Sequence, residues 1–294
     1  MARRTRGRGP SRWDKVNSLR GKVKRRLKNM PEKEFNVLVV GMPGSGKSTF
    51  INSMIMAVTG TWKAVAHYAD SDERVTECLE RYVMFDDNCK EVDEHHPIQG
   101  YKQNVVFWDC AGFNDATEEV YSTIVSLTAD GRLPSGTKVV ECMNQTPDEL
   151  RSKFRRVDRN MTFDRIVFVL SASSDVPNNL VKAIKSGAKQ GHDVPIIVVM
   201  TKKDNCPNPD DVDRRSQEAK AAFNLKGNKE RFKETSLYCE DLTSSPDPND
   251  HEVMVQNDEI DKNLLNTWMT LTEPNIKAKP APDEPHAQSW CVLL

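Results

Sequence analysis

The sequence predicts an α/β fold in which helices cover both faces of a mostly parallel central sheet, giving three layers. Two observations support this prediction. Four short apolar runs have the length of buried strands, and stretches of helical composition lie between several of them. A glycine-rich loop follows the first run directly, as expected where a strand turns sharply into a helix.

The apolar runs define the expected order of elements. Strands are predicted at 35–40, 105–108, 166–170 and 196–200, with weaker candidates at 82–85 and 232–238. Helices are predicted at 48–58, 176–190, 211–224 and 258–271. No apolar run approaches the roughly 18 residues of a membrane-spanning helix, so none is expected. The seven cysteines are odd in number and irregularly spaced, which favours reduced thiols over a disulfide framework or a zinc site.

The glycine-rich loop, residues 41–48, matches the pattern GxxxxGK[ST] over its full length. Its glycines let successive backbone N–H groups point at phosphate oxygens, and the N-terminus of the next helix favours the same negative charge. Lys47 is expected to reach the β- and γ-phosphates and to act in catalysis, and the Ser48 hydroxyl to bind Mg²⁺. The residues predicted to hold a nucleotide here are Gly41, Gly44, Ser45, Gly46, Lys47, Ser48 and Thr49.

Two further stretches follow predicted strands and indicate which nucleotide binds. Asp109 and Gly112 form a DxxG, whose carboxylate is expected to hold the Mg²⁺ water shell while the glycine N–H approaches the γ-phosphate. Thr201, Lys202 and Asp204 fit [NT]KxD. The Asp204 carboxylate can accept hydrogen bonds from guanine N1–H and the 2-amino group, and adenine lacks both donors. Each tetrapeptide alone is a weak signal, but all three in this order predict GTP or GDP with Mg²⁺.

These motifs resemble the G domain of P-loop GTPases of the TRAFAC type over roughly residues 34–272. Within that class the chain is similar to the interferon-induced protein 44 family. This likeness rests on the Gly-Lys-Ser-Thr-Phe-Ile-Asn-Ser run that closes the P-loop, and on the segments 76–82, 131–134 and 203–207.

The resemblance implies two further site residues. A switch threonine between the P-loop and the DxxG should contact Mg²⁺ and take part in catalysis. Thr76 is the candidate because it precedes the weak second strand; Thr61 is the alternative, and an ordinary surface role for Thr76 stays open. A loop after the last strand should contact the base, and Ser236 is the candidate there.

One position departs from the pattern of small GTPases. Many of them have a glutamine directly after the DxxG, where it orients the attacking water, and this chain has Phe113. We therefore expect hydrolysis to be slow, or to need a residue from a partner or from a second subunit in a homodimer. Asn114 and Asp115 follow Phe113, and the sequence does not place their side chains.

The N-terminal 33 residues are strongly basic, with thirteen Lys and Arg against two acidic residues. Residues 11–28 have the apolar spacing of an amphipathic helix, with basic residues on its other faces. This segment is predicted to contact an anionic membrane surface. Two alternatives remain, an arm for nucleic acid or the nucleus and a merely solvated tail, and the membrane is favoured over nucleic acid.

The C-terminus ends in Cys291-Val292-Leu293-Leu294, which fits a CaaX box with geranylgeranylation of Cys291. The Pro-rich stretch before it reads as a flexible linker. One lipid chain binds a membrane only reversibly, so the basic N-terminus is expected to supply a second signal. We accordingly divide the chain into a basic amphipathic segment (1–33), a GTP-binding domain (34–272) and a flexible tail (273–294).

Two functions from different classes fit these expectations. The first is a slow or partner-dependent GTPase that acts as a molecular switch, cytoplasmic and peripheral on the cytosolic face of a membrane, with protein effectors that the sequence does not identify. The second is a nucleotide-controlled self-assembly or interaction protein with negligible turnover, in host defence by resemblance to its family. A P-loop ATPase or nucleotide kinase is disfavoured by Asp204 and by the lack of an evident acceptor-binding lid.

Overall fold

A computed structural model describes residues 12–62, 65–66, 76–85, 104–116, 119–225, 228, 230–239, 244–246, 252–274 and 276. Cys291, with the rest of the predicted tail beyond 276, and residues 1–11 lie outside this range. The strands are β1 (Phe35–Gly41), β2 (Glu80–Val83), β3 (Val105–Asp109), β4 (Arg165–Ser171), β5 (Ile196–Thr201), β6 (Phe232–Glu234), β7 (Ser244–Pro246) and β8 (Glu252–Met254). The helices are α1 (Arg12–Lys28), α2 (Lys47–Thr59), α3 (Glu119–Ala129), α4 (Val139–Cys142), α5 (Pro147–Lys153), α6 (Asn178–Gln190), α7 (Pro209–Ala222) and α9 (Asp258–Leu271), with 3-10 turns η1 (Arg159–Met161) and η2 (Lys203–Asn205).

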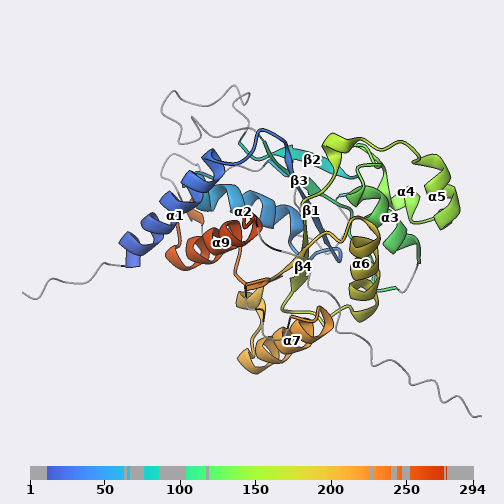
Figure 1. The fold of residues 1–294 in the computed structure, drawn as a ribbon. Coiled ribbons are helices and arrows are strands. Elements are labelled where there is room, and N and C mark those ends of the chain that lie inside the picture. Colours follow the sequence, from blue (N-terminus) through green and yellow to red (C-terminus); the bar gives the residue numbers. More distant parts are fainter. Residues whose placement is uncertain are drawn as a thin grey trace, which may run out of the picture.

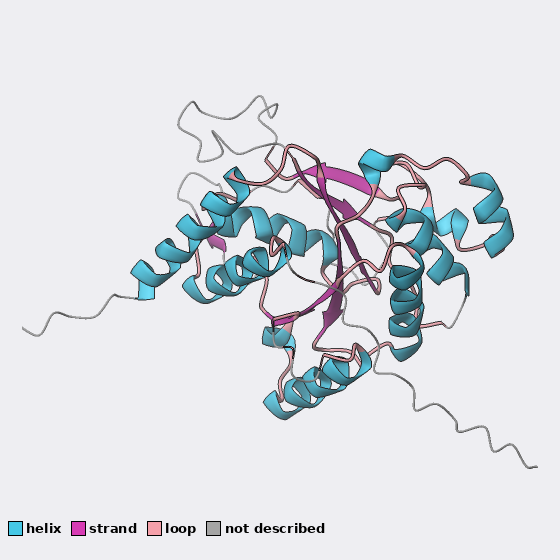
Figure 2. Cartoon of the chain, viewed as in Figure 1, coloured by secondary structure: helices cyan, strands magenta, loops and turns pink. Residues whose placement is uncertain are grey.

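The central sheet has six strands in the order β2-β3-β1-β4-β5-β6 (Figures 1 and 2). β2 runs antiparallel to β3, and the other neighbours are parallel. Two parallel strands must be joined by a crossover connection, which is usually a helix that packs on the sheet. Helices lie on both faces of this sheet. The predicted α/β fold is therefore confirmed. Among the described helices, none is both long and apolar enough to cross a bilayer.

Most predicted elements lie where the sequence placed them, with ends that shift by at most two residues. The weak strand β2 begins and ends two residues earlier than expected, at Glu80 and Val83. The other weak strand differs more: β6 ends at Glu234, after which 235–239 continue as a loop. This loop belongs to the candidate site, as described below.

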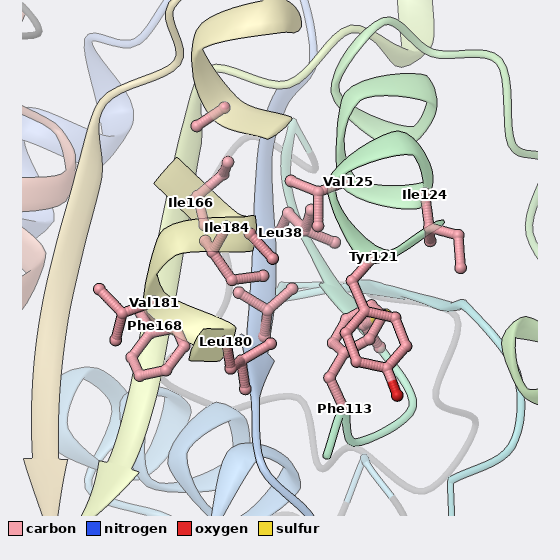
Figure 3. Packing of buried hydrophobic residues seen from close by; sticks show 14 of the residues in the cluster. Leu38, Phe113, Tyr121, Ile124, Val125, Ile166, Phe168, Leu180, Val181 and Ile184 are labelled. Carbon is pink, nitrogen blue, oxygen red and sulfur yellow. The ribbon is translucent and has the colours of Figure 1, made fainter. Parts of the chain in front are cut away.

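The two faces of the sheet have separate apolar cores. One core joins β-strand side chains to α1, α2 and α9. The other joins the opposite side chains of the same strands to α3, α4, α5, α6 and α7. Figure 3 shows part of the second core, where Leu38, Ile166 and Phe168 of the sheet lie near residues of α3 and α6. The alternation of side chains along a strand produces this division.

Helix α1 packs against α9 through its apolar stripe. Val16, Val23 and Leu27 are almost fully buried, which confirms the amphipathic helix predicted at 11–28. The outer side keeps the basic residues Lys15, Lys22 and Arg25 exposed, and Trp13 remains 50% exposed. The apolar stripe is thus occupied by the domain itself, and any contact with an anionic surface falls to the outer side.

Several elements were not predicted. Helix α3 is buried on nearly all sides, so its sequence lacks the polar face that makes a helix recognisable by its period. Helix α5 did have a local signal, because Thr146 and Glu149 form a capping box and Pro147 stands at the first helical position. The residues from 131 to 161, with α4 and α5, form a lobe beside α3 (Figure 1).

Candidate nucleotide-binding site

The three motifs and the loop after β6 come together at one edge of the sheet, where the parallel strands β1, β3, β4, β5 and β6 end. The Thr201 hydroxyl donates to the Ser45 carbonyl at 2.8 Å, which ties the [NT]KxD stretch to the P-loop. The Phe113 N–H donates to the Gly41 carbonyl at 3.1 Å, which ties the DxxG stretch to it. A Cβ at Gly46 would lie 3.3 Å from Leu237 Cδ1, so the loop after β6 also touches the P-loop. The ends of parallel strands are where such sheets bind ligands.

The P-loop backbone has the shape that its glycines permit. Gly44 and Gly46 have positive φ angles of 67° and 88°, in the left-handed region that a side chain disfavours. At Gly41 a Cβ would stand 2.2 Å from the Val169 carbonyl oxygen, so only glycine fits beside β4. Helix α2 begins at Lys47, and Thr49 lies in its first turn. Its N-terminus therefore faces the loop, as a phosphate site requires.

Lys47, Ser48 and Asp109 form a charged cluster at this edge. The Ser48 hydroxyl donates to Asp109 Oδ2 at 2.5 Å, and the buried Lys47 ammonium donates to the Met42 carbonyl at 3.0 Å. Burial raises the pKa of the Asp109 carboxyl to about 6, although Lys47 and the Ser48 hydrogen bond act in the opposite direction. These three residues come from two motifs that lie about sixty positions apart in the sequence.

The donors present at Ser48 and Asp109 fit a magnesium ion. Asp109 Oδ1 is buried and has no hydrogen-bond partner within the described part of the chain, which leaves one carboxylate oxygen available. A hydroxyl and a carboxylate are oxygen ligands of the kind that Mg²⁺ binds, usually together with waters and phosphate oxygens. Among the described residues no group of three or more His, Cys, Asp or Glu could hold a metal by itself.

Gly112 lies directly against the P-loop. A Cβ at this residue would stand 2.5 Å from the backbone nitrogen of Pro43. Only glycine allows this approach of the DxxG backbone to the loop. Pro43 occupies a variable position of the GxxxxGK[ST] pattern, so no sequence signal pointed to this contact.

The residue after the DxxG points into the core. Phe113 is fully buried and its ring lies 5.0 Å from that of Tyr121 in α3 (Figure 3). Asp115 is also engaged elsewhere, because its Oδ1 accepts hydrogen bonds from the Asn179 and Leu180 N–H groups at the start of α6. The N-terminus of α6 is therefore capped by a side chain from a distant loop, a contact that local sequence does not reveal.

The residues predicted to contact the base follow β5 and β6, which lie on the side of β1 opposite to β3 and the DxxG stretch. Thr201 is fully buried at the end of β5, Lys202 has a φ of 55°, and Asp204 is exposed within η2. Ser236 is half-buried, and its carbonyl accepts a hydrogen bond from the Thr235 hydroxyl at 2.6 Å. The exposed Asp204 and the half-buried Ser236 thus belong to two stretches that both contact the P-loop, one through Thr201 and the other through Leu237.

Thr76 lies beyond the end of β3, on the same edge. Glu80 of β2 pairs with Asp109, and β2 is antiparallel, so the residues before Glu80 extend past Asp109. The backbone of this segment pairs with the lobe, through hydrogen bonds from Leu79 to Thr137 and from Gly136 to Leu79, each 2.8 Å long. Thr61, the alternative, follows the last turn of α2, roughly 18 Å from the phosphate end by helix rise. Of the two candidates, Thr76 therefore lies nearer to the edge that carries the P-loop.

Comparisons with known proteins agree with this geometry. The family model described as 50S ribosome-binding GTPase matches residues 36–202, which is more than half of the chain. A second model, the FtsK/SpoIIIE family, matches residues 3–63, a shorter stretch that includes the P-loop. No curated protein matches the chain.

Solved structures of a plant GTPase match most of the chain at low sequence identity. Toc33 from Arabidopsis thaliana in complex with GDP and Mg²⁺ matches with 17% identity and a TM-score of 0.48, over 90% of this chain and 93% of that one. The same protein in complex with Mg²⁺ and GMPPNP matches with 16% identity and a TM-score of 0.46, over 89% and 92%. The motifs, the strand order and the family match lead to one conclusion: the chain belongs to the 50S ribosome-binding GTPase family and is a GTP-binding protein built on a P-loop G domain.

Proposed function

We propose that this protein is a slow or partner-dependent GTPase that works as a membrane-associated molecular switch. One observation carries the proposal. The groups that bind and polarise the phosphates are together at the sheet edge, but the position that would orient the attacking water is a phenylalanine buried against Tyr121. Such a site favours tight nucleotide binding over fast turnover.

In this proposal each residue of the phosphate side has a defined role. Lys47 leaves the Met42 carbonyl and binds the β- and γ-phosphates, and Ser48 and Asp109 hold the magnesium ion directly and through its water shell. A bound magnesium ion would supply positive charge next to the phosphate oxygens. Thr76, in the segment before β2, would contact that ion and would be the second catalytic residue. Gly112 offers its N–H to the γ-phosphate.

The guanine side uses the exposed carboxylate of Asp204. This carboxylate accepts hydrogen bonds from N1–H and the 2-amino group, the stem of Lys202 covers the base, and the loop at Ser236 closes the other side. The Thr201 hydroxyl donates to the Ser45 carbonyl and so holds the stretch 201–204 against the P-loop. Replacing Asp204 with asparagine should lower the affinity for GTP relative to that for xanthosine triphosphate, whose base has an acceptor where guanine has a donor.

Two ends of the chain would hold the switch at a membrane. Cys291 is the proposed site of geranylgeranylation, and the outer side of α1 adds Lys15, Lys22 and Arg25 with the exposed Trp13. Each basic residue near an anionic leaflet contributes on the order of 1 kcal/mol. The likeness to the interferon-induced protein 44 family, and the division into basic segment, GTP-binding domain and tail, belong to this proposal.

The lipid anchor is tested by fractionating cells that express the Cys291→Ser variant. The variant should move from membranes to the cytosol. A double variant, Lys22→Glu with Arg25→Glu, should weaken binding to anionic vesicles and leave neutral vesicles unaffected. Unchanged fractionation of the cysteine variant would refute the anchor without touching the nucleotide site.

The second candidate function is nucleotide-controlled self-assembly with negligible turnover. The buried Phe113 favours it as well, because the site then lacks the side chain that would orient an attacking water. The two candidates differ in how turnover depends on protein concentration. A homodimeric GTPase turns over faster as the protein is concentrated, a switch that needs a different partner does not, and an assembly protein shows no turnover while its size changes with nucleotide.

The deciding experiment measures nucleotide binding and single-turnover hydrolysis on purified protein with Mg²⁺. GTP and ATP are compared over a range of protein concentrations, with light scattering to follow size. The Lys47→Ala variant serves as the control for a disabled phosphate site. Equal affinity for GTP and ATP would refute the guanine assignment, and fast turnover at high dilution would refute the description of a slow or partner-dependent enzyme.

A further inference from the structure

A buried carboxylate lies outside the nucleotide site and joins three parts of the molecule. Asp261 of α9 is fully buried. Its Oδ1 accepts a hydrogen bond from the Tyr238 hydroxyl at 2.7 Å, and its Oδ2 lies 2.5 Å from the Arg20 guanidinium of α1. Taking such a charge out of water is costly unless it is paired, and an apolar group of the same size is often as stable. The carboxylate therefore suggests a role beyond stability.

Both partners of Asp261 are fixed by further contacts. Arg20 also donates from Nε to the Ala57 carbonyl of α2 at 2.8 Å. The Tyr238 hydroxyl accepts from the Asn257 N–H at 2.9 Å, and the Tyr238 N–H donates to the Ser53 hydroxyl of α2 at 3.0 Å. Tyr238 is fully buried, and burial raises the pKa of its phenol, so the group stays a hydrogen-bond donor. The cluster thus joins α1, the P-loop helix α2, α9 and the loop after β6.

The loop after β6 connects this cluster to the nucleotide site. Tyr238 follows Leu237, whose side chain lies beside Gly46 of the P-loop, and Leu237 follows Ser236. The Thr235 N–H donates to the Met200 carbonyl at 2.9 Å, which attaches the other end of the loop to the sheet. Between Thr235 and Tyr238 the loop is therefore held at both ends, and the Tyr238 end is held through Asp261.

We propose that Tyr238, Asp261 and Arg20 are positioning residues for guanine recognition: they hold the 235–238 loop against the base and make its position depend on the docking of α1. The inference rests on the proposed function, in which this loop contacts guanine. The residues do not touch the nucleotide, and they act through the loop that carries Ser236. Because the outer side of α1 is basic, an anionic surface that pulls α1 from the domain would loosen the same loop.

The test measures the dissociation constants of GDP and ADP with Mg²⁺ for full-length wild-type protein and four variants. Tyr238→Phe removes one hydroxyl, and Arg20→Gln breaks the link to α1. Asp261→Asn keeps an acceptor for the tyrosine and serves as the conservative substitution. Arg26→Gln is the matched control, since Arg26 also joins α1 to α9, through the Met269 carbonyl at 2.8 Å and Glu273, without touching Asp261.

The expected result is a change in selectivity. Tyr238→Phe and Arg20→Gln should lower the preference for GDP over ADP by about threefold to tenfold, the size of one lost hydrogen bond. Arg26→Gln should leave the preference unchanged, and Asp261→Asn should lie between the two groups. A general loss of stability lowers both affinities together, so the ratio separates positioning from folding, and circular dichroism at the working temperature checks that each variant is folded.

Three results would overturn the inference, and each has a different meaning. If wild-type protein prefers GDP and the Tyr238 and Arg20 variants keep that full preference, the loop does not depend on this cluster while the proposed function stands. If wild-type protein shows no preference for GDP, the proposed function fails and this inference fails with it. An equal effect in the Arg26 control would also overturn it, because the effect would then come from a general loosening between α1 and α9 and not from the link through Asp261.

Discussion

The two faces of the central sheet support the nucleotide site in different ways. On one face α1 and α9 pack on α2, the helix that follows the P-loop, and α2 also contacts the loop after β6. On the other face α3 and the lobe pack beside the DxxG stretch and the segment before β2. One face therefore supports the parts that are proposed to bind phosphate and base, and the other supports the segments that are proposed to respond to the γ-phosphate.

We propose that this difference gives binding and signalling separate cores. The lobe at 131–161 is hydrogen-bonded to residues 77–79 and lies next to α3, the helix that follows the DxxG stretch. The face with α1 has its own link, from Arg20 through Asp261 to Tyr238 in the loop after β6. Substitutions on the two faces should accordingly have different effects on nucleotide binding even where they cost the same stability.

The largest effects are expected from two buried tryptophans, one on each face. Trp268 donates from Nε1 to the Met54 carbonyl of α2 at 2.9 Å, and Trp108 donates to Asn36 Oδ1 at 2.9 Å. Replacing either with alanine should lower the free energy of unfolding by about 3–5 kcal/mol, measured by urea denaturation. Saturating GDP should restore less stability to the Trp268 variant, because that variant loosens α2. Equal recovery in both would contradict the assignment of the two faces.

A smaller effect is expected when Phe113 is replaced with glutamine. The side chain would be buried against Tyr121, so the variant should lose about 3 kcal/mol of stability and gain nothing in single-turnover hydrolysis. Replacing the neighbouring exposed Asn114 with glutamine is the control and should leave stability nearly unchanged. A faster rate in the Phe113 variant would mean that the loop can turn this side chain toward the nucleotide.

Substituting Gly112 with alanine should lower the affinity for GTP more than the affinity for GDP. The new Cβ would collide with Pro43, so the DxxG backbone must move away from the P-loop. One hydrogen bond to a charged oxygen is worth about 2 kcal/mol, so the affinity for GTP should fall roughly thirtyfold while that for GDP changes little. Gly21→Ala is the control, because a Cβ there meets nothing within 4 Å. An equal loss for both nucleotides would place Gly112 away from the γ-phosphate.

The smallest effect concerns cysteine reactivity. Burial raises the pKa of the Cys110 thiol to about 12, so at pH 8 hardly any of it is the reactive thiolate. Cys206 is half-exposed next to η2. Iodoacetamide followed by mass spectrometry should label Cys206 and leave Cys110 unmodified until the protein unfolds. Labelling of Cys110 in native protein would show that the core on the α3 face opens locally.

Much of the fold could be predicted because its signals are local. The buried strands are continuous apolar runs, and the P-loop is a strand, a glycine turn and a helix within some twenty residues. Helix α3 and the lobe were missed for the opposite reason: α3 is apolar on nearly every side, and its position depends on partners in α5 and α6 rather than on a repeat in its own sequence.

The sequence by itself determined the α/β sheet and the phosphate loop, and it predicted one acidic residue for magnesium and another for guanine. Each of these depends on residues within a few positions of one another, and short spacings constrain the backbone strongly. Only the tertiary structure decided where distant side chains go. It buried Phe113, drew Asp115 to the start of α6, and joined Arg20 to Asp261 across 241 positions, because packing and desolvation act between parts of the chain that the sequence does not bring together.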